Sequence, residues 1–124
     1  MAPINAYKEL EKCFGQLQAL KEASSMLHWD AATIMPKSVA SAAARSEQIS
    51  ALDGICHEIL NSNKISDLLN EAQNQSTLNN WQTANLREMK HMWTHSNAVT
   101  SDLVVALSED CMKCEIKWRS TRPV

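Results

Sequence analysis

Apolar residues recur every three or four positions along most of this chain, the spacing that places side chains on one face of an α-helix. The longest of these stripes predicts a first helix from about Ile4 to Thr33. Its inner face is formed by Tyr7, Leu10, Phe14, Leu17, Leu20, Ser24 and Leu27. Pro36 follows, and because a proline disfavours helix in the residue before it, it ends this element or opens the next.

The same periodicity predicts a second and a third helix. The second runs from about Lys37 or Ser38 to Leu60, and its apolar face contains Ile49, Leu52, Cys56 and Ile59. Small residues fill its first half, which suggests that another helix approaches closely there: Ala40, Ala42, Ala43 and Ala44. After the polar residues 61–63, a short third helix carries on one side Ile65, Leu68, Leu69 and Ala72.

A fourth and a fifth helix follow the polar residues 74–77. The fourth spans roughly Thr77 to His95, with an apolar face of Leu78, Trp81, Leu86, Met89, Met92 and Trp93. The fifth begins at the capping residues 100–102 and has the most regular stripe in the chain: Leu103 or Val104, Leu107, Cys111, Cys114 and Trp118. Packing in a core or an interface is the expected role of Trp81, Trp93 and Trp118.

These elements predict one all-α domain over residues 1–124, an antiparallel bundle of about five helices joined as helical hairpins. The composition agrees, because 2 glycines and 3 prolines are too few for the many tight turns of a strand-rich fold. Hydrophobic residues make up 44% of the chain and charged residues 21%, which is normal for a globular domain rather than a disordered one.

Charge and hydropathy exclude several classes of partner. A formal net charge of −2 gives no basic surface for nucleic acid and no polybasic anchor for a membrane. No apolar run is long enough to span a bilayer, and the first residues do not have the pattern of a secretory signal. We therefore expect a cytoplasmic protein with reduced thiols at Cys13, Cys56, Cys111 and Cys114.

Two pairs of residues have the spacing of metal ligands. His91 and His95 lie four apart on one helical face, and Cys111 and Cys114 lie three apart, so together they offer a Cys2His2 zinc set. Against this interpretation, the cysteines sit inside a helical stripe rather than on a tight knuckle, and cysteine is a common small core residue. The residues alone therefore predict no catalytic, cofactor-binding or metal-ligating site.

Other polar residues favour structural roles. Asp30 is expected to cap a helix end or to form a salt bridge near it while Trp29 packs, and Arg45 and Gln48 share a helical face from which they can reach a carboxylate such as Asp30. His28 and His57 are lone histidines, for which a surface or hydrogen-bonded role is expected. No serine–histidine–acid arrangement or phosphate-binding glycine loop is present in the sequence.

The chain nevertheless resembles a known family at positions spread over most of its length. They are Tyr7, Leu10, Leu27, Trp29, Asp30, Met35, Pro36, Arg45, Gln48, Leu52, His57, Asn85, Leu86, Arg87, Trp118 and Arg122. In order and spacing these residues are similar to the N-terminal region of the carboxypeptidase Taq family of metallocarboxypeptidases. Glycines that often follow Met-Pro in that family are replaced here by the segment 37–40.

The resemblance implies that this is the N-terminal helical domain of a longer, all-helical, cytoplasmic enzyme that releases single residues from peptide C-termini. Family members hold zinc, or sometimes cobalt, with the histidines of His-Glu-x-x-His and a later glutamate. That motif is absent from this sequence. The implied role of the segment is to flank or cover the substrate groove, with no catalytic residue of its own and no peptidase activity in isolation. Its implied partners are the remainder of the parent peptidase and the peptide substrate.

Two alternatives stay open at this point. The chain is also compatible with a stand-alone helical interaction module that assembles through its apolar stripes, for example as a homodimer. A third interpretation is a small zinc-binding helical protein that uses His91, His95, Cys111 and Cys114.

Overall fold

The computed structural model describes residues 5–122, and this part of the chain contains five α-helices and no strand. The helices are α1 (Ala6–Thr33), α2 (Val39–Leu60), α3 (Asn63–Gln73), α4 (Asn80–Asn97) and α5 (Ser101–Thr121). The predicted all-α class and the number of helices are confirmed, and the predicted helix ends agree within a few residues. The predicted start of the first helix at Ile4 lies outside the described residues.

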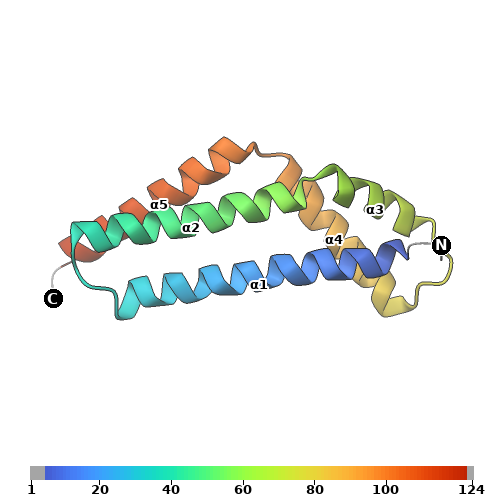
Figure 1. The fold of residues 1–124 in the computed structure, drawn as a ribbon, viewed down its shortest axis with the longest axis horizontal. Helices are drawn as coiled ribbons and strands as arrows, with labels where there is room; N and C mark the ends of the chain where they lie inside the picture. The colour runs from blue at the N-terminus through green and yellow to red at the C-terminus, as the bar shows by residue number, and fades with distance from the viewer. Residues whose placement is uncertain (1–4, 123–124) are drawn as a thin grey trace.

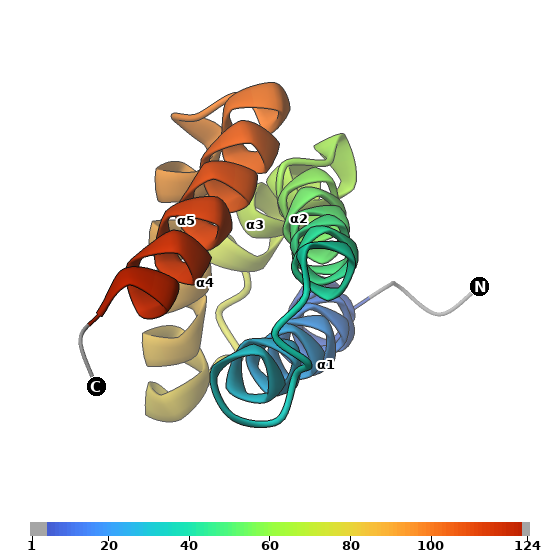
Figure 2. The ribbon, with the colours of Figure 1, turned by 90° about the vertical axis from the view of Figure 1, so that its left-hand side faces the viewer.

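The helices form an elongated assembly built on one long hairpin (Figure 1). α1 and α2 run antiparallel along most of its length, and α5 returns antiparallel to α2. The short α3 continues beyond the end of α2 and packs against α1, whereas α4 crosses the hairpin at a steep angle (Figures 1 and 2). Residues of α1, α2, α4 and α5 thereby come together on one side of the molecule.

Side-chain caps fix where the helices begin. Asn5 and Ser38 accept hydrogen bonds from backbone N–H groups three residues along, at 3.2 and 3.1 Å, and so start α1 and α2. At the start of α4, Asn79 and Gln82 each accept a bond from the other's backbone N–H, at 2.9 and 3.0 Å. This reciprocal capping box satisfies two N–H groups that would otherwise lack a partner.

The hydrophobic core lies where the N-terminal half of α1 meets α3, α4 and the end of α2. The predicted stripe of α1 is confirmed, since Tyr7, Leu10 and Leu17 are almost completely buried. The apolar side of α3 is buried as a whole, as its periodicity predicted. The residues that complete this core cluster are Ala6, Cys56, Leu60, Ile65, Leu68, Leu69, Ala72 and Leu86.

The stripe predicted for the fifth helix is wrong as a core face. Leu103 and Leu107 are 56% and 60% exposed, and both cysteines of the stripe are exposed as well. α5 packs against α2 with a different face, on which Met112 is buried. Periodicity identifies an apolar face but not what covers it, and in the described part of the chain nothing covers this one.

The tryptophans also divide into a partly buried residue and exposed ones. Trp93 packs partly buried against the core cluster, as expected, but Trp81 is 81% exposed and Trp118 is 56% exposed. Trp29, which was expected to pack beside Asp30, is also mostly exposed. Core packing is therefore excluded for Trp29, Trp81 and Trp118, each of which presents a large apolar ring to solvent, and packing in an interface stays a prediction for Trp81 and Trp118.

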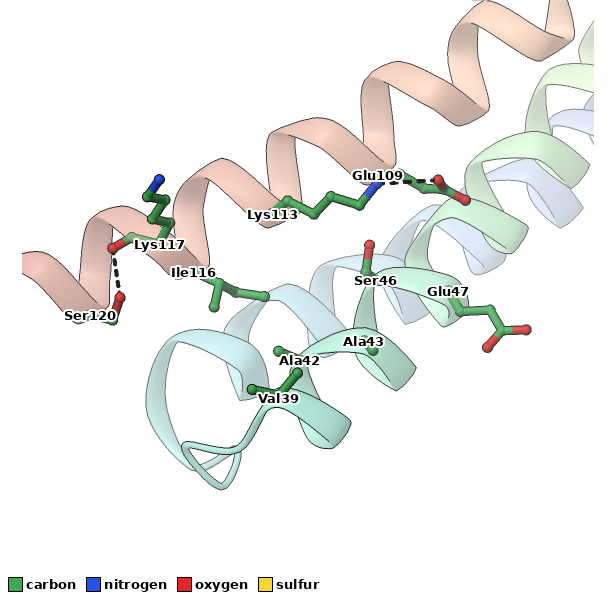
Figure 3. Close-up of a pocket in the computed structure, with 10 residues that line it drawn as sticks. All are labelled: Val39, Ala42, Ala43, Ser46, Glu47, Glu109, Lys113, Ile116, Lys117 and Ser120. Atoms are coloured by element: carbon green, nitrogen blue, oxygen red, sulfur yellow. Dashed lines mark hydrogen bonds and ion pairs between the residues drawn. The ribbon is translucent and has the colours of Figure 1, made fainter.

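The small residues in the first half of α2 do not bring α5 close there. The first half of α2 and the second half of α5 are separated by a hollow of about 660 Å³, lined by Ala42, Ala43 and Ile116 among others (Figure 3). The close approach lies further along, at Gly54, where an added Cβ would stand 3.1 Å from a methyl group of Val105. The two helices thus converge near the end of α2 and diverge toward its start.

A pair of leucine substitutions compares how much a buried and an exposed helix face contribute to the free energy of unfolding. Leu17→Ala removes a side chain that is 1% exposed and is expected to lower the free energy of unfolding by about 2–5 kcal/mol. Leu107→Ala, on the exposed face of α5, is expected to change it by no more than about 0.5 kcal/mol. Urea unfolding followed by circular dichroism measures both. Equal losses would contradict the assignment of the core.

Candidate functional site

One end of the α1–α2 hairpin is joined by a charged contact. Arg45 of α2 places Nη1 2.6 Å from Oδ2 of Asp30, and the same guanidinium donates to the carbonyl of Leu27 at 3.1 Å. The Asp30 carbonyl accepts from the N–H groups of Ile34 and Met35, at 3.0 and 2.9 Å, and so closes the last turn of α1. The predicted structural tie between Arg45 and Asp30 is confirmed. Gln48 is exposed and takes no part in it.

A second polar contact fixes the connection between α4 and α5. His57 of α2 is buried and lies 2.7 Å from the carbonyl of Val99 and 3.1 Å from that of Ser96, both through Nε2. Because carbonyls only accept, Nε2 carries the hydrogen, and Nδ1 accepts from the hydroxyl of Ser101 at 2.9 Å. Asn61 donates to the Ser96 hydroxyl at 3.1 Å. The hydrogen-bonded structural role expected for His57 is confirmed.

These contacts also explain the sequence of residues 57–61, which the pattern of motifs in the sequence did not single out. Residues 57–61 read His-Glu-Ile-Leu-Asn, so they begin like a zinc-protease helix but have Asn61 in place of the second histidine. The imidazole of His57 uses both ring nitrogens within the fold. Glu58 lies exposed on another side of α2. This segment is therefore a structural clamp, and the spacing of residues alone does not distinguish the two roles.

A groove of about 690 Å³ is lined by residues of α1, α2, α4 and α5. Its lining is mostly apolar, with polar groups from every helix: Lys21, His28, Asp53, Cys56, His57, His91, His95, Ser96, Ser108, Cys111 and Glu115. Ser108 donates to the carboxylate of Asp53 at 2.5 Å and so links α5 to α2 beside the groove. Burial raises the pKa of the Cys56 thiol, with a small opposing effect from Lys21.

The four residues of the alternative Cys2His2 interpretation do not form a metal-binding cluster. Within residues 5–122 no group of three or more histidine, cysteine, aspartate or glutamate side chains is placed to hold a metal ion. His91, His95 and Cys111 line the same groove, but Cys114 does not. The fold and its contacts thus describe a helical scaffold, in which polar residues join helices rather than converge on one reacting atom.

Comparison with known proteins identifies the family of this scaffold. The sequence matches the family model of the carboxypeptidase Taq (M32) metallopeptidases over residues 9–123, which is nearly the whole chain. The chain belongs to this family of metal-dependent peptidases. Neither the search of curated proteins nor the search of solved structures gave a match. Among the described residues, no helix combines the length and apolarity needed to cross a membrane.

The fold accounts for many of the positions that carry the family resemblance. Asn85 of α4 donates to the hydroxyl of Tyr7 in α1 at 3.3 Å, and Leu10 and Leu86 belong to the core. Asp30, Arg45 and His57 make the helix-to-helix contacts described above. The remaining positions include exposed residues whose side chains have no such internal role: Trp29, Pro36, Gln48, Arg87, Trp118 and Arg122.

Removal of the charge at Arg45 tests the hairpin tie. Arg45→Met keeps the apolar stem but removes the ion pair with the carboxylate of Asp30 and the additional hydrogen bond to the carbonyl of Leu27. We expect a loss of about 1–2 kcal/mol, reduced by the partial exposure of the pair. Arg87→Met is the matched control, because its ion pair with Glu88 is far more exposed and should contribute little. Urea unfolding that shows equal effects at both positions would contradict the tie.

The cysteines should differ in reactivity. Since the thiolate is the reactive form, the raised pKa and burial of Cys56 are expected to make it the slowest of the four to alkylate at pH 8. The exposed Cys111 and Cys114 should react first. Iodoacetamide labelling followed by peptide mass spectrometry measures the order, and labelling in urea should remove the difference. Alkylation of Cys56 in the folded chain as fast as Cys111 would contradict its burial.

Proposed function

We propose that this chain is the N-terminal helical domain of a metal-dependent carboxypeptidase that releases single residues from the C-termini of peptides. Residues 1–124 flank or cover the substrate groove of that enzyme and contribute shape rather than catalytic groups. The observation that carries the proposal is a family match over residues 9–123 in a sequence without His-Glu-x-x-His. The metal ion, zinc or another divalent cation, is held by the remainder of the parent enzyme.

Exposed apolar residues support a domain that packs against further protein. Leu103 and Leu107 lie on one face of α5, and Trp118 lies further along the same helix, each more than half exposed. The ring of Trp118 stacks only with the guanidinium of Arg122, 5.2 Å from its centre, among the contacts of the described residues. A domain that packs against the rest of a larger peptidase would cover such a face, which costs hydration free energy when it is left in water.

The proposed setting is the cytoplasm, with a peptide as substrate and the remainder of the parent peptidase as partner. Free thiols at all four cysteines agree with a reducing compartment. The second candidate function is a stand-alone interaction module, in which a second copy of the chain covers the face of α5. It is favoured by the same exposed residues, and it predicts a stoichiometric homodimer.

The purified 124-residue chain is expected to be inactive as a peptidase. Without the histidine pair and its glutamate, it cannot position a metal-bound water against a scissile carbonyl. Hydrolysis of an N-blocked dipeptide is measured after addition of Zn²⁺, Co²⁺ or Mn²⁺, with a complete carboxypeptidase of the family as positive control. Metal-dependent release of the C-terminal residue by this chain alone would overturn the proposal that the catalytic groups lie in the remainder of the parent enzyme.

The reading frame of the gene distinguishes the two candidate functions. If it continues into a helix with His-Glu-x-x-His and a later glutamate, the segment is the front of a peptidase. If the frame has no such continuation and sedimentation equilibrium shows a dimer, the interaction module is the better description.

A further inference from the structure

His91 and His95 are the strongest unexplained chemical feature of the surface. They lie four residues apart in α4, and their ring centroids are 5.9 Å apart. Both side chains are exposed, and neither takes part in a hydrogen bond or ion pair among the described residues. The imidazoles therefore have no internal role that would compete with a ligand.

The spacing of the pair matches chelation by one helix. Residues four apart are neighbours on a helix surface, so the two rings can turn toward a common point without any change in the backbone. Imidazole is a ligand for zinc, copper and nickel, whereas calcium and magnesium require oxygen ligands. The chemistry of this pair thus selects borderline transition metals.

The surroundings favour a positive charge at this position. His95 lies in the last turn of α4, where the partial negative charge of the free carbonyls stabilises a cation. Both histidines line the groove between the helices, whose lining also contains a carboxylate from Asp53 and an ammonium from Lys21.

We propose that His91 and His95 form a chelating site for a borderline divalent transition metal, of the class of Zn²⁺ or Ni²⁺, at the edge of the groove. The site is separate from the catalytic metal of the proposed parent enzyme and does not depend on it. Two protein ligands leave further coordination positions open to water or to a carboxylate from outside the chain. The Cys2His2 set is not required, because Cys114 does not line the groove.

The test is titration of the untagged 124-residue chain with Ni²⁺ by isothermal calorimetry, since Ni²⁺ does not oxidise the thiols. We expect one ion per chain. Because the second imidazole binds as an intramolecular step, His91→Ala or His95→Ala should each weaken binding by roughly a hundredfold. His28→Ala is the matched control, since His28 is also exposed and lines the same groove. This control variant should bind as the unchanged chain does.

A second measurement separates the histidines from the thiols. The variant with both Cys111→Ser and Cys114→Ser should keep its Ni²⁺ affinity, and Co²⁺ bound to the unchanged chain should lack the near-ultraviolet charge-transfer band of a thiolate ligand. Saturating Ni²⁺ should also raise the melting temperature, because the pair is preformed only in the folded helix. The His91→Ala variant should not show this increase.

Three results would overturn the proposal. They are unchanged affinity in both single-histidine variants, an equal loss in His28→Ala, and loss of binding in the double serine variant. None of them depends on peptidase activity, so the metal site and the proposed function can fail independently.

Discussion

Burial of one stripe of α1 is the interaction on which the rest of the structure depends. Tyr7, Leu10 and Leu17 are each no more than 1% exposed, and they lie where α3, α4 and the end of α2 converge. A short helix such as α3 is marginal in isolation, so its contact with α1 determines its stability. The steep crossing of α4 then follows, because Leu86 and the partly buried Trp93 must reach the same cluster.

Away from this core, polar contacts replace apolar burial. At the other end of the hairpin, Arg45 and Asp30 join α1 to α2, and along α2 the residues His57 and Asp53 hold the start and the middle of α5. The contacts of His57 and Asp53 join segments far apart in the sequence, and all three contacts depend on specific geometry. α5 is thus held mainly by α2 and by a few directed bonds. This explains why one of its faces is left exposed and why the two helices diverge at the hollow beside Ala43.

The sequence predicted the helices well because the signals for them are local. The stripe of α1, the capping residues Ser38 and Asn79 and the break before Pro36 each act within a few residues. It also predicted the tie of Arg45 to Asp30, since both residues lie near the hairpin turn. The exposure of Trp81 and of the stripe of α5 was not predictable, because burial depends on which helices lie opposite. The clamp formed by His57 could not be predicted either, since its partners are carbonyls more than 38 residues along the chain.

The positions that carry the resemblance to the carboxypeptidase Taq family fall into two groups, those with a structural contact within this fold and those without one. Some are explained within the chain, as Tyr7 is by its bond from Asn85 and Arg45 by its ion pair. Others, such as Trp29 and Trp118, expose large aromatic rings that are not buried in the core of this domain. A solvent-exposed tryptophan contributes little to the stability of a single domain, whereas at an interface it is among the residues that contribute most to binding. The exposed members of the family pattern therefore support the proposed packing against further protein, and the ends of α1 and α5 are the faces proposed for that contact.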